Sequence, residues 1–421
     1  MLQKDSTTLS TAEQAPPALP LWRNRDFLLL VSGQGVSSIG TQVSQLAFPL
    51  LMLAVTHSPA QAGLLTALRS LTYVLLCLPA GALVDRWDRK RVMILCDSGR
   101  ALALGSIPLA LAFGLLSLPQ LYLVSLVEGT LFVFFQMAEY AALPHVVTKE
   151  QLPAATGQNE VLYSTALLLG PPLGGALYSI ARMLPFLGDA VSYAASVVSL
   201  FFIRTKFQGE RESTSQQHLW ADVQMGLRWL WHHPLLRFLA ILTCGLTAPC
   251  AGYALILIVI AQGQHASATV IGLIFAGAGA GSIAGAALAS PLQRRFGFAR
   301  LVPAVAWVWA LTWLLIPLAP NPLLLGIING LAYAIVPVYT VTQYSYRMAL
   351  IPEHLQGRVN SVFRLISFGC QPLGMALTGV LLQIVGPVPT ILLLFIPQAL
   401  VAFAASMNRH VRHARPIEEL V

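Results

Sequence analysis

Long apolar stretches make up most of the chain, and short polar segments rich in turn residues separate them. Twelve stretches have about the 20 residues that an α-helix needs to cross the hydrocarbon core of a bilayer. The pattern predicts transmembrane helices at about residues 27–53, 61–84, 92–116, 120–142, 158–180, 185–203, 236–261, 269–292, 301–319, 322–348, 360–384 and 388–407. The expected fold class is therefore an all-α membrane protein.

The 25 Lys and Arg residues are distributed asymmetrically along this threading. Most lie in the two termini and the even-numbered loops, and Arg182 alone lies in an odd-numbered loop. The three others, Arg69, Arg100 and Arg364, fall within predicted spans. Because basic loops stay on the cytoplasmic side, both termini are predicted to be cytoplasmic, in a multi-pass protein of a bacterial inner membrane.

Composition agrees with a membrane location. Charged residues make up only 10% of the chain, against about 25% in soluble domains. The formal charge of +8 is spread between apolar runs, so the lipid bilayer is the expected partner and nucleic acid is not. No metal-ligand spacing, nucleophile elbow or nucleotide loop occurs, so neither a metal, a cofactor nor an enzyme activity is expected.

The longest polar stretch between spans divides the predicted helices six and six. We expect a disordered cytoplasmic leader at 1–22, a first bundle at 23–204, a linker at 205–234, a second bundle at 235–408 and a cytoplasmic tail at 409–421. Apolar residues recur in the linker at helical spacing, which favours an amphipathic helix on the inner leaflet over a plain solvated linker. They are Leu219, Val223, Leu227, Leu230 and Trp231.

Three segments carry a resemblance to a known family. The entry to the first span reads LWRNRDF at 21–27, the loop after the second span reads GALVDRWDRKR at 81–91, and the fifth span contains GPPLGG at 170–175. Together they resemble the major facilitator superfamily, and within it the bacterial multidrug and macrolide efflux type of drug:proton antiporter. Asp88, Ala166 and Arg294 depart from the family pattern, the last replacing an acidic residue in the second half.

The resemblance implies two pseudo-symmetric six-helix bundles that work by alternating access. It implies a gating latch in the first half, made of Gly81, Asp85, Arg86, Arg89, Lys90 and Arg91. It implies an exporter motif made of Gly170, Pro171, Gly174 and Gly175. Ordinary positive-inside topology is the alternative explanation of the basic residues in the latch.

Polar residues recur on one face of spans one, seven and ten, and such stripes must face protein or water. The resemblance assigns these helices to a central cavity. Its candidate lining is Gln34, Ser38, Thr41, Gln42, Gln45, Tyr253, Asn329, Tyr333 and Thr340. For any one of them, an interhelical hydrogen bond is the alternative.

Ionisable residues inside spans imply function or pairing. Glu128 and Arg69 each lie about nine residues, or roughly 13 Å, from the outer end of their helix. We expect them to pair, with Glu128 either a proton-coupling residue or part of a structural ion pair. Asp97 and Arg100 are expected to pair locally near the inner gate.

Other charges and small residues have simpler interpretations. Glu139, Arg364 and Asp189 lie nearer span ends, where snorkelling to the surface is the alternative to a role in coupling. Gly277 and neighbouring glycines at four-residue spacing predict close helix packing, with the fifth span as the expected partner across the halves.

The predicted function is secondary active transport by a monomer. We expect proton-coupled efflux of hydrophobic or amphiphilic small molecules. A dedicated exporter of one metabolite, such as a siderophore or an antibiotic, is the first alternative. A non-transporting protein on a transporter-like scaffold is the second, and an intramembrane enzyme is the third.

Overall fold

The computed structural model describes residues 20–205, 207–208, 219–352 and 355–414. These residues are helical, with no strand among them. The expected disordered leader lies almost wholly outside the described residues, as does the end of the C-terminal tail.

Six long helices form the first half of the chain. Several begin at a polar cap, since Asn24, Ser58, Asp88 and Ser117 each accept a backbone hydrogen bond in the first turn, which stabilises a helix start. The helices are α1 (Arg25–Thr56), α2 (Pro59–Val84), α3 (Arg89–Ala112), α4 (Leu118–Val146), α5 (Leu152–Ile180) and α6 (Leu184–Phe202), after a short η1 (Leu21–Arg23).

The second half has more breaks. Its helices are α8 (Pro234–Cys250), α9 (Tyr253–Gly263), α10 (Ala268–Leu315), α11 (Pro322–Leu350), α12 (Gln356–Gly369), α13 (Gln371–Val385), α14 (Pro387–Met407) and α15 (Arg409–Arg412), with η2 at Ile316–Leu318. The pairs α8–α9 and α12–α13 each form one apolar span of 30 residues.

Eleven stretches of the described residues are long and apolar enough to cross a membrane, and one of them contains two of the predicted spans. Ala268–Leu318 has 51 residues; as one straight helix it would be about 75 Å long, more than twice a bilayer core. The helix breaks at Gly297, whose φ of 66° favours glycine. The eleven stretches therefore accommodate all twelve predicted crossings.

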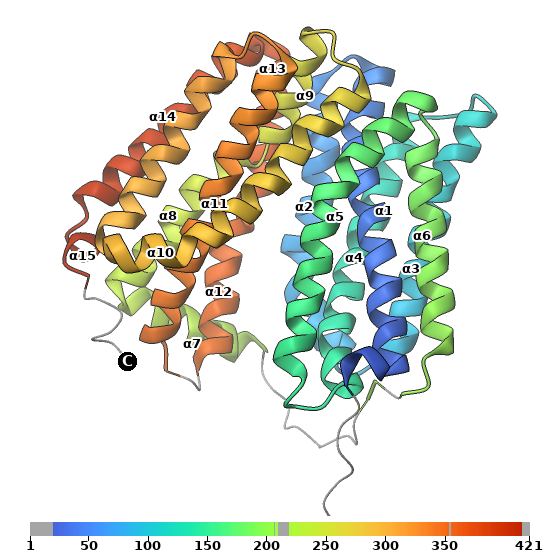
Figure 1. Cartoon of the computed structure of the whole chain (residues 1–421), viewed down its shortest axis with the longest axis horizontal. Helices are drawn as coiled ribbons and strands as arrows, with labels where there is room; N and C mark the ends of the chain where they lie inside the picture. The colour runs from blue at the N-terminus through green and yellow to red at the C-terminus, as the bar shows by residue number, and fades with distance from the viewer. Residues whose placement is uncertain (1–19, 206, 209–218, 353–354, 415–421) are drawn as a thin grey trace, which may run out of the picture.

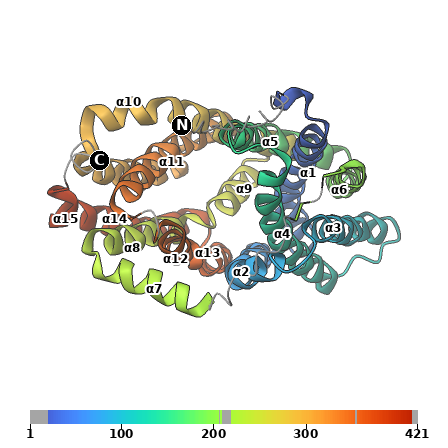
Figure 2. The same cartoon turned by 90° about the horizontal axis from the view of Figure 1, so that it is seen from below.

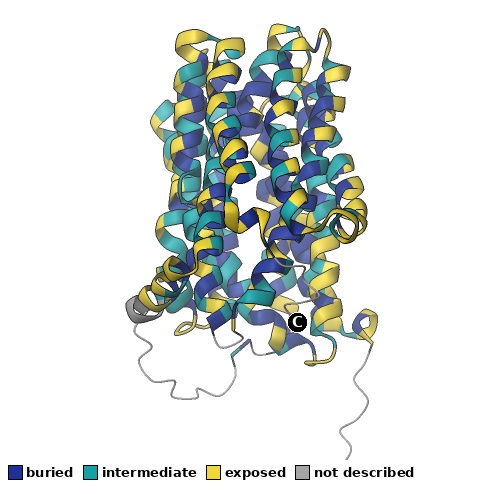
Figure 3. Cartoon of the chain, turned by 90° about the vertical axis from the view of Figure 1, so that its left-hand side faces the viewer, coloured by how far each residue is buried: buried dark blue, intermediate teal, exposed yellow. Residues whose placement is uncertain are grey.

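The helices form two bundles that stand side by side (Figure 1). The start of α1, the short α15 and the linker helix α7 (Leu219–His232) lie toward the lower face in this view, which we call the loop face. Exposed positions lie on the outward sides of the helices (Figure 3), and many of the exposed residues are large and apolar. Leu102, Leu323 and Leu373 are each more than 70% exposed, as expected of a surface that contacts lipid.

The two halves touch closely on the face opposite the loop face, here called the far face. A Cβ at Gly175 would lie 2.2 Å from the carbonyl oxygen of Ala268, and one at Gly63 would lie 2.8 Å from the Cα of Gly379. Figure 2 shows the resulting neighbours, α2 beside α13 and α5 beside the start of α10. Small residues thus close the far face by direct backbone contact.

The glycine stripe of α10 packs differently from the prediction. Cβ atoms at Gly277, Gly281 and Gly285 would meet the backbone of α11, in the same half. The contact with α5 exists, but it is made by Gly272 against Pro171 and by Gly279 against Leu168. The two sets face different neighbours because they lie on different sides of one helix.

The linker contains the predicted helix, α7, which packs against α12. A Cβ at Gly226 would lie 2.7 Å from the carbonyl oxygen of Arg358. Leu230 is fully buried, whereas Trp231 is 53% exposed. One side of α7 therefore binds the second half, and contact of its other side with the inner leaflet stays a prediction.

Candidate functional site

A cavity of about 420 Å³ lies between the two halves. Gln45, Arg69, Tyr73 and Phe132 line it from the first half, and Leu255 and Met375 from the second. Arg69 is the one charged side chain among its described lining residues. The volume is in the range of small-molecule sites.

An aromatic pocket of about 230 Å³ adjoins this cavity and shares Ala251 and Gln371 with it. Tyr253 lines it, and the centre of its ring lies 5.4 Å from that of Trp313 and 6.3 Å from that of Tyr333. Trp309 completes the wall. Aromatic faces of this kind bind apolar and cationic groups.

Arg69 connects the cavity to a buried carboxylate. Its Nε lies 2.8 Å from Oε2 of Glu128, and its Nη2 donates to Oε1 at 3.1 Å. The Arg69 side chain is 18% exposed and that of Glu128 is 1% exposed. The predicted pair therefore exists, with the cation on the cavity wall and the carboxylate behind it.

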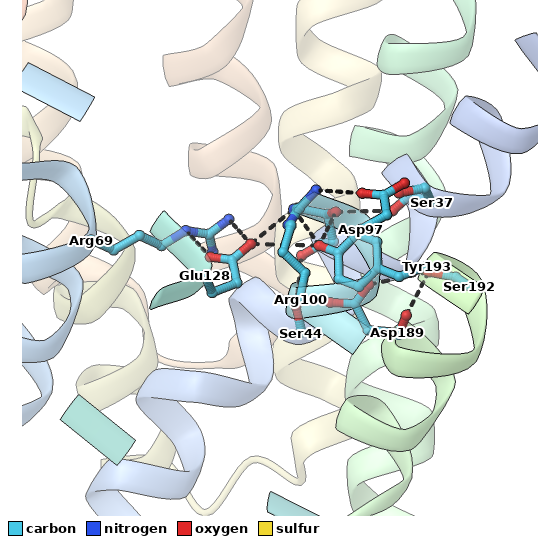
Figure 4. Close-up of polar contacts among 10 residues, drawn as sticks. Ser37, Ser44, Arg69, Asp97, Arg100, Glu128, Asp189, Ser192 and Tyr193 are labelled. Carbon is cyan, nitrogen blue, oxygen red and sulfur yellow. Dashed lines mark hydrogen bonds and ion pairs between the residues drawn. The ribbon is translucent and has the colours of Figure 1, made fainter. Parts of the chain in front are cut away.

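The charge network continues inward from Glu128 (Figure 4). Arg100 Nη2 lies 2.9 Å from Oε1 of Glu128, and Arg100 Nη1 lies 3.4 Å from Oδ1 of Asp97. The local pair of Asp97 and Arg100 was expected near the inner gate, but its link to Glu128 joins it to the chain of charges behind the cavity. Two guanidinium groups thus face two carboxylates, which offsets the cost of burying each charge.

Tyr193 closes the inner end of the network. Its hydroxyl accepts a hydrogen bond from Arg100 and lies 2.8 Å from Oγ1 of Thr41. The guanidinium carbon of Arg100 sits 4.0 Å from the centre of the Tyr193 ring. A chain of polar contacts therefore runs from the cavity wall at Arg69 to α1 and α6.

Asp189 lies on α6 beside this network and is fully buried. Snorkelling to the surface, the alternative considered for it, is therefore wrong. Ser192 Oγ donates to its Oδ1 at 3.2 Å. A Cβ at Gly40 would lie 2.6 Å from the same oxygen, so the absence of a side chain at Gly40 makes room for the carboxylate.

The predicted cavity residues fall into two groups. Gln45 lines the main cavity, and Tyr253 and Tyr333 line the aromatic pocket. Ser38 is partly exposed and lies seven residues before Gln45, while Thr340 is exposed and lies seven residues after Tyr333. A seven-residue step is nearly two helical turns. Ser38 therefore lies on the same face of α1 as Gln45, and Thr340 lies on the same face of α11 as Tyr333.

The second group joins helices instead. Gln34 donates to Ser196 at 3.5 Å, Thr41 contacts Tyr193, and Asn329 donates to the carbonyl of Ile274 at 2.8 Å. A Cβ at Gly170, in the exporter motif, would lie 2.3 Å from the Cβ of Gln42. In this structure these residues serve as the interhelical contacts that were the alternative interpretation.

The other exporter-motif residues also lie at helix contacts. A Cβ at Gly174 would lie 2.7 Å from the carbonyl oxygen of Val43, which packs α5 against α1. Pro171 and Gly175 lie where α5 meets α10 at the far face. The motif therefore packs α5 against α1 in its own half and against α10 in the other half.

The gating loop makes most of its contacts within the first half. Arg89 Nη1 donates to the carbonyls of Ala141 at 2.9 Å and Phe207 at 3.1 Å, and Lys90 donates to the carbonyl of Ile203 at 2.7 Å. Oδ1 of Asp85 lies 3.5 Å from Nη2 of Arg89.

Within the described part of the chain, the ion pairs and hydrogen bonds of the latch residues stay in the first half. The Asp85 side chain is 70% exposed, and a Cβ at Gly81 would meet no atom of the described residues within 4 Å. Arg86 and Arg91 are exposed, the latter beside Asp88. The loop-face end of α2 is therefore open.

Arg364 crosses between the halves. Its Nη2 donates to the hydroxyl of Tyr73 at 3.0 Å. Both residues line a pocket of about 160 Å³, and Tyr73 also lines the main cavity. Arg364 thus extends the lining of the inter-half space toward α12.

Sequence reasoning missed Tyr193, Tyr73 and the two tryptophans of the aromatic pocket. Each is an aromatic residue in an apolar span, a pattern equally typical of core and of lipid-facing positions. Counting residues from the start of the helix, as for Glu128, would have placed Tyr193 at the depth of the network. Only the fold shows that α6 packs against α3.

Comparison with known proteins also indicates a membrane transporter. Residues 17–419 match the model of a family described as transmembrane secretion effector. The chain is 26% identical over 393 residues to the multidrug efflux pump Tap of Mycolicibacterium fortuitum, covering 90% of this chain and 94% of the relative. It is 25% identical over 355 residues to the enterobactin exporter EntS of Citrobacter koseri, covering 84% of each.

A solved structure shares the fold. A bacterial homologue of the iron transporter ferroportin, crystallised in an inward-facing state, superposes with a TM-score of 0.71 at 17% sequence identity. The match covers 93% of this chain and all of that protein. This agreement establishes the helical arrangement of the major facilitator fold.

Proposed function

Because the chain belongs to the transmembrane secretion effector family of the major facilitator superfamily, and is a multi-pass efflux transporter, we propose that it exports hydrophobic or amphiphilic small molecules in exchange for protons. It would act as a monomer in a bacterial inner membrane, with both termini in the cytoplasm. The relative that is a multidrug efflux pump supports a broad substrate range.

The ion pair of Arg69 and Glu128 on the cavity wall is the observation that carries the proposal. A proton that binds Glu128 removes one of two carboxylates from the network. Arg69 and Arg100 then face Asp97 alone, which leaves net positive charge beside the cavity. A cationic amphiphile binds less well in that state, so proton and substrate compete, as exchange in opposite directions requires.

The cavity has the chemistry for such substrates. Aromatic walls at Tyr253, Trp309 and Trp313 match apolar rings. Gln45 and Tyr73 add polar contacts without a fixed charge. A few polar groups on an apolar surface allow binding of varied molecules with modest selectivity.

The conformation supports alternating access. Backbone contacts close the far face, while Asp85 of the latch is exposed. If the loop face is cytoplasmic, this is the state that loads substrate from the cytoplasm. In the opposite state, we expect Asp85 to approach the N-terminal end of a helix in the second half, where its charge is favoured.

Dye accumulation in cells tests the proposal. Cells that express the protein should accumulate less ethidium than cells with an empty vector, and collapse of the proton gradient should abolish the difference. Low accumulation that persists without the gradient would contradict proton coupling.

A dedicated exporter of one metabolite is the second candidate, and the similarity to an enterobactin exporter favours it. A panel of unrelated amphiphilic dyes separates the two. Export of several members supports the broad range, whereas export of one siderophore-like compound and of no dye supports the dedicated exporter.

A further inference from the structure

Two adjoining pockets lie at the N-terminal end of α8, away from the cavity between the halves. One, of about 530 Å³, is lined by α8, α11 and α15, and the other, of about 430 Å³, lies between α8 and α15. They share Pro234, Arg409 and His410. We call the lining of the two pockets together the basic groove.

The groove gathers basic side chains. Its described lining holds no carboxylate and contains these basic residues: His233, Arg237, Arg409, His410 and His413. Positive-inside topology accounts for basic residues on this face but not for their convergence on one groove. In the first half, by contrast, Arg89 and Lys90 are engaged with backbone carbonyls.

Backbone carbonyls orient two of the histidines, and Arg237 keeps unused donors. The Nδ1 of His233 bonds to the carbonyl of Trp229 at 2.9 Å, and that of His413 bonds to the carbonyl of Arg409 at the same distance. Since a carbonyl only accepts, Nδ1 carries the hydrogen in each ring, and Nε2 is then an acceptor in the neutral ring and a second donor in the doubly protonated ring. Arg237 uses Nη1 on the carbonyl of Trp231 at 3.3 Å and retains further N–H groups.

The groove also has an apolar edge that faces outward. Phe238 and Ile241 line its second pocket, and Ile241 is 52% exposed. Ile241 lies four residues, or about 6 Å, along α8 from Arg237. Cationic groups and an exposed apolar surface therefore meet one helical turn apart, as at the boundary between lipid headgroups and acyl chains.

We propose that the basic groove binds the phosphate headgroup of an anionic phospholipid, whose acyl chain lies along Phe238 and Ile241. Guanidinium groups form strong paired hydrogen bonds to phosphate oxygens. Basic pockets between transmembrane helices near the membrane surface suit anionic lipid headgroups. A free anion would use the cations and leave the apolar edge without a role.

Native mass spectrometry of the purified full chain, delipidated and given equal amounts of phosphatidylglycerol and phosphatidylethanolamine, tests the proposal. The wild type should retain phosphatidylglycerol preferentially. Arg409→Gln should weaken its binding about fivefold, from the loss of one surface charge, and Arg237→Gln with Arg409→Gln about thirtyfold, from the loss of two. Arg294→Gln with Arg295→Gln removes the same charge from another exposed segment and should leave retention unchanged.

Three results would overturn the proposal. One is equal retention of the two lipids, and another is equal loss of phosphatidylglycerol in both double variants. The third is full displacement of the lipid by soluble glycerol 3-phosphate at the same concentration, which would indicate a simple phosphate site. If Arg237→Gln with Arg409→Gln does not elute as a single species, the single variant Arg409→Gln, at an exposed position, decides the test by itself. None of these outcomes depends on transport.

Discussion

Arg100 and Glu128 form an ion pair at 2.9 Å in the interior of the first half, although they lie on different helices and 28 residues apart. Both side chains are at least 98% buried. The pair sits between the cavity-facing Arg69 and the inner carboxylate Asp97. It therefore joins the cavity wall to the core of the bundle.

Removing Arg100 should destabilise the protein strongly. Arg100→Gln leaves Asp97 without a cationic partner and Glu128 with Arg69 alone. Breaking a buried ion pair from one side costs about 3–5 kcal/mol. Thermal unfolding in detergent should show a large drop in midpoint.

Arg69→Gln is the matched control, because Arg69 is partly exposed and Glu128 keeps Arg100. Its midpoint should fall much less. Equal falls for the two variants would mean that burial does not set the energy of this network.

The gating loop gives a second prediction. Arg89→Ala removes donors to the carbonyls of Ala141 and Phe207 and should cost about 1–3 kcal/mol. Arg86→Ala changes an exposed side chain of the same type in the same loop and should leave stability within error. If the two lose stability equally, Arg89 does not anchor the loop to α4.

A third prediction concerns closure of the far face. The Ser179 and Thr269 hydroxyls are 2.9 Å apart and come from different halves. In a background with the five native cysteines replaced, Ser179→Cys with Thr269→Cys should form a disulfide under mild oxidation. Transport should stop on oxidation and return on reduction, because the far face can no longer open.

Each single cysteine variant controls for the substitution itself. Undiminished transport by a fully cross-linked population would contradict alternating access through this face.

The threading of the chain could be predicted because it rests on strong local signals. Apolar length and the distribution of basic residues depend on neighbours in sequence only, and the break at Gly297 falls in the loop that they predict. The pairing of Arg69 with Glu128 could be predicted by counting residues from the start of each helix. Two neighbouring helices that start at the same membrane surface bring residues of equal depth together.

The partners of single polar residues could not be predicted. Gln34, Thr41 and Gln45 share a stripe on α1, yet Gln34 and Thr41 contact α6 while Gln45 lines the cavity. A stripe has the same sequence pattern whether it faces protein or water. Only the packing of α6 against α1, aided by Gly40, separates the cases.

The central claim is that Glu128 couples export to protons, and reconstitution tests it most directly. In proteoliposomes with an acidic lumen, inside-out wild-type protein should accumulate ethidium as the lumen becomes alkaline. Glu128→Gln has the neutral side chain of the protonated state, so its gradient-driven uptake should fall at least tenfold and it should bind ethidium more weakly, with an affinity that no longer changes with pH. The exposed control Glu150→Gln should behave as wild type. Gradient-driven uptake by Glu128→Gln at the wild-type rate would contradict the account.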